Sequence, residues 1–246
     1  MKKILLVGLF LVSIGMTAQS AKLRYDLKKG DKFLVELTLK QNMAPILSMD
    51  IDLGMILQAT GKQGSDFETQ YKISEVKMDV AAQGQNMTFD SKKKDSELTD
   101  EERKVKAEIE PALKMIVYQT LSSLGKVTST KIEPQVQGAA AMVSQNQFLF
   151  IEYPTEAVKV GSSWDFGQNM NGVNTQTKYV VTKITNTEVY ADITGSIQGT
   201  TDAKVGGKVI IDRGTGMMNS MIFDLSVGST GMGSMSMNVN LTTKKI

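Results

Sequence analysis

The side chains best suited to chemistry in this sequence are thioethers and carboxylates, because the chain contains neither cysteine nor histidine. Met232, Met235 and Met237 form an M-x-x-M-x-M pattern near the C-terminus, and thioethers are soft ligands that select Cu(I). The last two methionines also continue into Val239 and Leu241 at every second position, which predicts one buried face of a strand. We favour the strand face, and we expect no metal site and no cofactor.

A pair of aspartates, Asp50 and Asp52, has the D-x-D form of some calcium and catalytic sites. Both fall on the polar face of an alternating segment, and the further acids and the glycine of an EF-hand loop are missing. The lack of cysteine and histidine excludes cysteine nucleophiles, Ser-His-Asp triads and His/Cys zinc sites. No nucleophile-elbow, Walker or dinucleotide-binding motif occurs. We therefore predict a protein that is not an enzyme.

The N-terminal segment has the composition of a secretory signal peptide. Lys2 and Lys3 precede an apolar run over residues 4–14, and small or polar residues follow up to Ser20. The run is too short for a membrane span, and no cysteine is present for a bacterial lipid anchor. Residues 1–20 are predicted to be a signal peptide cleaved after Ala18 or after Ser20, so the mature chain is expected in the periplasm or outside the cell.

The predicted mature chain, residues 21–246, carries no net charge. Two of the 28 basic residues lie in the signal peptide, which leaves 26 to balance the 26 acidic residues. Such a surface lacks the basic patch of a nucleic-acid-binding protein and the polybasic stretch of a peripheral membrane protein. The length suits a single β-rich domain with a substantial core, which must be stabilised by packing rather than by disulfides.

Most of this domain alternates apolar and polar residues with a period of two, the pattern of half-buried antiparallel strands. A one-residue slip in the alternation predicts a β-bulge near Ser74 and Glu75. Glycine-rich turns, among them Gly206-Gly207, are expected to separate the later strands. Residues 217–237 are poor in charge and fit either a free sheet edge that accepts a partner strand or the middle of a sheet.

A helical insert is expected over residues 98–146, between the two β regions. Thr99 and Glu102 have the spacing of a capping box, and apolar residues recur at helical spacing from there to Leu124. Pro111 predicts a kink or two helices in tandem, and a weaker helix is expected over 134–145. The insert is predicted to pack on the sheet, and packing alone is favoured over a role as a lid.

Two stretches of the sequence are similar to each other. Residues 27–33 and 158–164 share the order apolar, Lys, any residue, Gly, two polar residues and a large aromatic residue. The shared order predicts two similar halves, at about 21–97 and 147–246, which flank the helical insert. The alternative is that this order is simply a common way to begin a strand.

Residues 153–164, which read YPTEAVKVGSSW, resemble the V-x-V-G-[DS]-[ST]-W signature of uncharacterised exported proteins from Bacteroidetes. Those proteins also begin with a segment like residues 25–31 and end with a strand, acidic turn and strand like residues 210–216. The resemblance implies an envelope location and a β-rich fold, and it implies no catalytic residue. The order of elements is also similar to that of periplasmic lipoprotein carriers, in which helices close a curved sheet over an apolar cavity.

These patterns together predict a mainly β, α+β protein built of curved antiparallel sheets with a helical insert. Methionine-rich alternating strands provide a deformable apolar lining, so we expect a lipid-like small molecule or another envelope protein as the partner. The alternative is a structural or protein-interaction module of the envelope without a ligand. The residues expected to line an apolar site are Val35, Leu37, Leu53, Met55, Ile116, Met235 and Met237.

Overall fold

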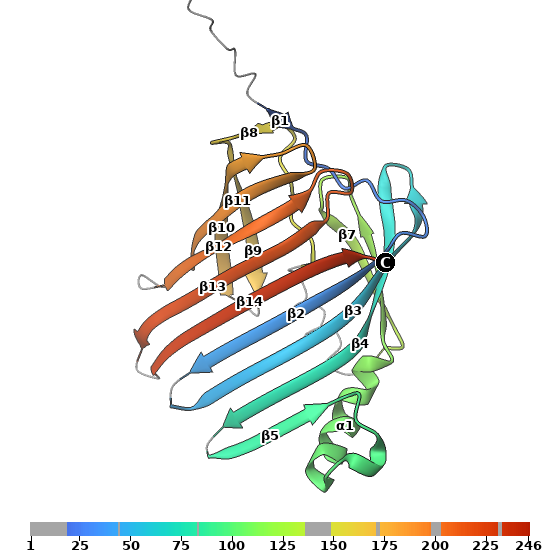
Figure 1. The fold of residues 1–246 in the computed structure, drawn as a ribbon, viewed down its shortest axis with the longest axis vertical. Coiled ribbons are helices and arrows are strands. Elements are labelled where there is room, and N and C mark those ends of the chain that lie inside the picture. The colour runs from blue at the N-terminus through green and yellow to red at the C-terminus, as the bar shows by residue number, and fades with distance from the viewer. Residues whose placement is uncertain are drawn as a thin grey trace, which may run out of the picture.

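The computed structural model describes residues 19–43, 45–82, 84–135, 149–170, 173–197, 203–230 and 233–246. These residues form a large antiparallel sheet, a two-stranded ribbon and a helix beside one edge of the sheet (Figure 1). The arrangement confirms the mainly β fold with antiparallel strands and a small helical part that the alternating sequence predicts.

The large sheet consists of two consecutive meanders. The first contains β2 (Lys32–Met43), β3 (Leu47–Gln63), β4 (Asp66–Ala82), β5 (Gln85–Asp90), β6 (Ile116–Leu121) and β7 (Val127–Glu133). The second contains β9 (Ser163–Met170), β10 (Val173–Ile184), β11 (Glu188–Ile197), β12 (Ala203–Asp212), β13 (Met218–Thr230) and β14 (Gly233–Lys245). Strand β14 pairs with β2 and joins the meanders, so the red C-terminal strands lie beside the blue N-terminal strands in Figure 1.

Alternation along the strands gives the sheet an apolar inner face and a polar outer face. In β2, Val35 and Leu37 lie directly opposite Met55 and Leu53 of β3, and directly opposed residues share a face. The intervening Glu36 faces the other side. In β4 the register shifts between the pairs Gly54–Glu75 and Met55–Ile73, and this shift confirms the bulge predicted from the sequence.

Two glycines lie inside strands instead of in a turn. Gly206 and Gly207 belong to β12 and pair with Asp224 and Phe223 of β13, so the prediction of a turn there is wrong. A Cβ atom on Gly207 would lie 2.1 Å from the carbonyl oxygen of Ile222. The glycine therefore permits a close approach of two strand backbones, and the pairing on both sides of β12 keeps it in the sheet.

The helical part is shorter than the sequence predicts. A 3-10 turn, η1 (Asp95–Glu97), precedes α1 (Asp100–Leu113). Thr99 caps α1 as expected, because its hydroxyl accepts from the Glu102 N–H while the Glu102 carboxylate accepts from the Thr99 N–H. The helix ends two residues after Pro111, and the prediction that it continues to Leu124 is wrong.

Strand β6 takes the place of the expected second half of that helix. Val117 and Leu121 are buried opposite Tyr71 and Phe67 of β4. Their spacing fits a period of two as well as a helical period, and pairing with the edge of β4 decides between the two. The described part of the insert, residues 98–135, thus contains one helix and two strands, β6 and β7. The helix expected over 134–145 falls almost wholly outside the described residues.

Two connecting segments fill one end of the inner face. The segment 21–27 leads from β1 (Ser20–Ala21) to β2, and the segment 149–158 leads into β8 (Val158–Lys159). Strands β1 and β8 pair with each other. We call this region the closed end, and its buried residues from the two segments are Ala21, Leu23, Tyr25, Leu27, Leu149, Phe150, Ile151, Tyr153 and Val158.

An aromatic cluster holds the closed end together. Tyr25 stacks on Tyr153 with ring centroids 5.1 Å apart, and Trp164 stacks on Tyr179 at 5.0 Å. The Tyr25 hydroxyl accepts from the Ile151 N–H at 3.0 Å. Burial raises the pKa of Tyr179 to about 12, so this hydroxyl stays neutral at physiological pH. The aromatic cluster is part of the packed core. The candidate binding surface is therefore at the opposite end of the sheet.

Candidate apolar binding surface

The opposite end of the sheet, at the hairpins β2–β3, β4–β5 and β13–β14, is called the open end. The register arranges its inner-face residues in rows that cross the strands. A middle row contains Leu225, Met237, Gln41, Met49, Val80 and Met87. The row on its closed-end side contains Phe223, Val239, Leu39, Ile51, Met78 and Phe89, and the row at the hairpin tips contains Val227, Met235, Met43, Leu47, Ala82 and Gln85.

Burial decreases along the inner face of β2 from the closed end to the open end. In β2, Val35 and Leu37 are 0% and 7% exposed, whereas Leu39 and Met43 on the same face are half-buried. The described residues therefore cover the open end only in part. We call the half-buried apolar residues of the three rows the open-end surface: Leu39, Met43, Leu47, Met49, Ile51, Met78, Val80, Ala82, Met87, Val227, Met235 and Met237.

Thioethers replace branched aliphatic side chains at the open end. Six of the twelve residues of the open-end surface are methionine, while the same face of β2 nearer the closed end carries Phe33, Val35 and Leu37. Methionine is unbranched and polarisable, so it adapts to irregular or changing shapes better than leucine or valine does. None of the three rows contains a charged side chain.

The outer face of the same strands carries charged and polar side chains, and these side chains pair with one another. Lys40 forms an ion pair with Asp50 at 2.8 Å, and the Thr38 hydroxyl donates to Asp52 at 2.6 Å. These contacts agree with the interpretation of Asp50 and Asp52 as a solvated polar face. Within the described part of the chain, no group of three or more carboxylates has the arrangement of a metal site.

A shallow hollow of about 400 Å³ opens on the outer face near Gly54. Its charged members are Glu36, Asp52 and Glu75, and Glu75 is paired with Lys92 at 2.6 Å. The Thr242 hydroxyl donates to Glu36 at 3.4 Å. The carboxylates of the hollow thus have partners from the chain itself, and we assign it no ligand.

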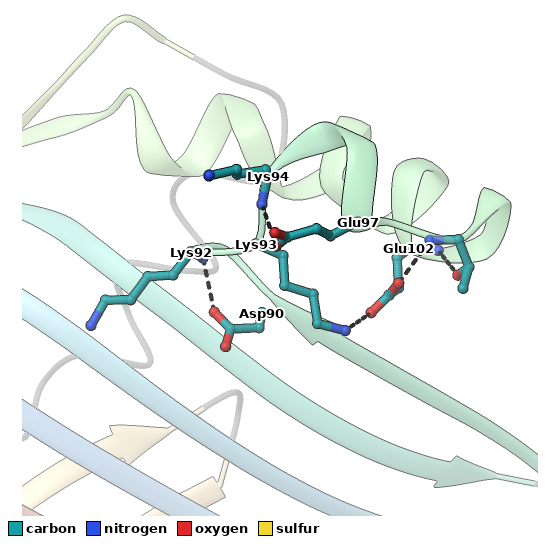
Figure 2. Close-up of polar contacts among 7 residues, drawn as sticks. Asp90, Lys92, Lys93, Lys94, Glu97 and Glu102 are labelled. Carbon is teal, nitrogen blue, oxygen red and sulfur yellow. Dashed lines mark hydrogen bonds and ion pairs between the residues drawn. The ribbon is translucent and has the colours of Figure 1, made fainter.

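Helix α1 is fastened beside β4 and β5 by a polar network (Figure 2). The Lys93 ammonium donates to Glu102 at 2.6 Å, and Glu102 is 5% exposed and also closes the cap of the helix. Figure 2 shows Lys92 and Lys94 bonded through their backbone N–H groups to Asp90 and Glu97. The Lys93 ion pair holds the pKa of Glu102 below its ordinary value. The loop 90–94 therefore sets where the helix lies on the sheet.

Two of the residues predicted from the sequence to line an apolar site, Met235 and Met237, lie on the open-end surface. Leu53 is half-buried on the same face, but it lies directly opposite Leu37 of β2 and outside the three rows. Val35, Leu37 and Met55 share their face but are buried in the core nearer the closed end. Ile116 lies elsewhere. It is on β6 next to Val117, which lies opposite Tyr71 of β4. Neighbouring residues of a strand point to opposite faces, so Ile116 faces the outer side.

Ten further residues of the open-end surface were missed at the level of sequence: Leu39, Met43, Leu47, Met49, Ile51, Met78, Val80, Ala82, Met87 and Val227. Each stands at an inward position of its own alternating strand, so the signal for its face was present. The missing information was the register, because only the pairing of β14 with β2 brings Met235 beside Met43. Exposure also depends on what packs over the face, and alternation does not report that.

Comparisons with known proteins do not place the chain in a family. No family model matches, and no curated protein matches. Among solved structures, the crystal structure of MucB in complex with MucA(peri) shares 10% identity over 87% of this chain and 89% of that chain, with a TM-score of 0.15. That likeness is too low to carry an argument. Among the described residues, no helix is long and apolar enough to cross a membrane.

Proposed function

We propose that this protein is an exported, non-enzymatic binding protein of the bacterial envelope that holds an apolar, lipid-like ligand on the open-end surface. The observation that carries the proposal is the contrast between the two ends of one apolar face. Connecting segments and aromatic rings bury the closed end, whereas the middle row and the hairpin-tip row are only half-buried or exposed, apart from the buried Leu225. An apolar face that is left partly accessible in this way is a candidate binding site.

The side chains of the surface indicate which part of a ligand they contact. The rows offer mainly thioether, aliphatic and aromatic groups, with Gln41 in their centre and Gln85 at the hairpin tips as the polar members. They match an acyl chain or another flexible hydrocarbon, because burying apolar surface contributes about 25 cal/mol per Å². A charged group of the ligand would lose hydration on this face without gaining a partner, so it would have to project beyond the hairpins.

The test combines native purification with a matched pair of substitutions. Met49 and Ser48 are neighbours on β3, but Met49 lies on the open-end surface and Ser48 is exposed on the outer face. Met49→Glu places a carboxylate among apolar rows and should abolish uptake of a hydrophobic dye and co-purification of amphiphiles. Ser48→Glu adds the same charge one residue away and should leave both unchanged.

The mature protein should also yield an amphiphile on solvent extraction and mass spectrometry. A native protein that takes up no dye and carries no amphiphile would contradict the proposal. Equal loss of dye uptake in both variants would contradict the assignment of the surface, because a general charge effect would then explain the result.

A second candidate function, recognition of another envelope protein, is favoured by β7. Among the described strands it ends the sheet, it pairs with β6, and six of its seven residues are exposed. Such an edge offers backbone donors and acceptors to an added strand. Replacing the exposed Thr128 or Thr130 by proline, which removes a backbone donor, should weaken strand addition, while dye uptake at the distant open end should persist. Loss of dye uptake without loss of partner binding would reject the edge as the interface.

A further inference from the structure

The register places three thioether side chains around one point of the open-end surface. Met235 of β14 lies directly opposite Met43 of β2. Met237 lies opposite Gln41, so it is a diagonal neighbour of Met43. Directly opposed residues have Cβ atoms about 5 Å apart, and diagonal neighbours are about 7–8 Å apart. Methionine has three rotatable side-chain bonds, so these sulfurs can converge on a single ion. Met49 of β3 occupies the other diagonal of Met43.

We propose that Met43, Met235 and Met237 form a binding site for a soft monovalent cation, with Cu(I) as the metal. Thioethers are soft ligands that select Cu(I) over harder ions. The three side chains are half-buried, so an ion can reach them from solvent while the surrounding aliphatic residues keep carboxylates and much of the water away. This site is independent of the proposed apolar ligand, although it occupies part of the same surface.

The composition of the chain makes the ligand set unusually easy to identify. The sequence has no histidine and no cysteine, so thioethers are the only soft side chains available for Cu(I). The polar groups nearest to the site by register, Gln41 on the inner face and Asn42 and Ser236 on the outer face, are uncharged. Thioethers do not take up protons, so affinity should stay constant between about pH 5 and pH 8, where a histidine site would weaken on acidification.

The experiment uses the purified mature protein under anaerobic, reducing conditions. Cu(I) is supplied as a complex with a chromophoric chelator, so that transfer to the protein is read from the loss of colour. Ag(I), which is soft and does not cycle between oxidation states under these conditions, provides a second probe by calorimetry. The expected result is one bound ion per chain at sub-micromolar free metal, with shifts of three methionine methyl signals in the NMR spectrum.

Three substitutions to leucine, Met43→Leu, Met235→Leu and Met237→Leu, remove the sulfurs but keep volume and apolarity. Each should weaken Cu(I) binding by about 10-fold or more, and the triple variant should lose it, because even changes behind the ligands weaken metal sites by about 10–100-fold. Met78→Leu is the matched control. Met78 is also half-buried on this face, but it lies on β4, two strands from Met43, so binding should persist.

Several outcomes would overturn the site. They are absence of binding at micromolar Cu(I), unchanged binding in the triple variant, and equal loss in Met78→Leu. A marked fall in affinity on acidification would point to carboxylates and would also overturn it. Dye uptake by the triple variant is expected to remain, and so a failure of metal binding is separable from a failure of the apolar ligand.

Discussion

Gly30 and Gly161 make the same backbone contacts at the start of the two meanders. The N–H of Gly30 donates to the Ala59 carbonyl and that of Gly161 to the Val181 carbonyl, at 2.9 and 2.8 Å. Both glycines have positive φ angles, 95° and 87°. In each case the residue after the glycine accepts a bond from the same neighbouring strand, through Asp31 and Ser162. We propose on this basis that the two halves arose by duplication.

The shared geometry predicts matched responses to substitution at these two positions. Gly30→Ala and Gly161→Ala should each lower the free energy of unfolding by about 1–2 kcal/mol, because a side chain is disfavoured at positive φ. A new Cβ atom meets nothing within 4 Å at either site, so the backbone angle alone determines the loss. Denaturant unfolding of the two variants measures it, and a difference of several-fold between them would contradict the equivalence.

Gly125 provides the contrasting case. It also has a positive φ angle, but a Cβ atom there would lie 2.0 Å from the Ile151 carbonyl oxygen and 2.7 Å from the ring of Tyr25. Gly125→Ala should therefore destabilise the fold more than either of the other two substitutions, because the linkers of the closed end must shift. A loss no larger than that of Gly30→Ala would show that this end is loosely packed.

Tyr153 links the closed end to the turn between β12 and β13. Its buried hydroxyl donates to the Gly216 carbonyl at 2.7 Å. Tyr153→Phe leaves that carbonyl without its donor and should lower the unfolding free energy by about 1–2 kcal/mol. Tyr118→Phe, at a half-buried residue of β6, is the control and should change it little. Equal effects in thermal or denaturant unfolding would reject a specific role for the Tyr153 bond.

The capping carboxylate of α1 predicts an acid-sensitive helix. The Lys93 bond, followed by the Thr99 N–H, lowers the pKa of Glu102 from its ordinary value of 4.5. The Glu102 carboxylate therefore stabilises the folded state fully above about pH 4.5. This contribution is lost as the pH falls through the lower pKa that the group has in the folded state. Glu102→Gln should destabilise the protein most at neutral pH, and its difference from the wild type should shrink in acid.

Hydrogen exchange of the α1 amides between neutral and acidic pH measures this effect locally. Glu108→Gln, on an exposed position of the same helix, serves as the control and should show little difference from the wild type at any pH. A Glu102→Gln deficit that stays constant down to the acid end would show that the charge of this carboxylate does not stabilise the helix.

The structure also distinguishes between the two expected cleavage sites of the signal peptide. Ala21 is 3% exposed and pairs with Val158, whereas Gln19 and Ser20 are exposed. Cleavage after Ser20 would place a charged amino terminus on a buried residue, which is unfavourable. The mature protein should therefore begin at Gln19, and the intact mass of the exported chain tests this. A mass that begins at Ala21 would contradict the prediction.

The sequence by itself determined the faces of most strands, the bulge near Ser74 and the cap at Thr99. These features follow from local rules, because alternation, register slips and capping residues act over a few positions along the chain. The alternating pattern also places Met235 and Met237 on the inward face of the last strand. The polar character of Asp50 and Asp52 was read correctly for the same reason.

Only the tertiary structure decided which inward residues are buried and which remain accessible. Val35 and Met43 carry the same alternation signal on one strand, yet Val35 is fully buried in the core cluster that includes the closed end, and Met43 is only half-buried near the hairpins. Likewise, residues 116–121 form a strand because they pair with the edge of β4. Long-range pairing and packing join residues far apart in the chain, so no local pattern can specify them.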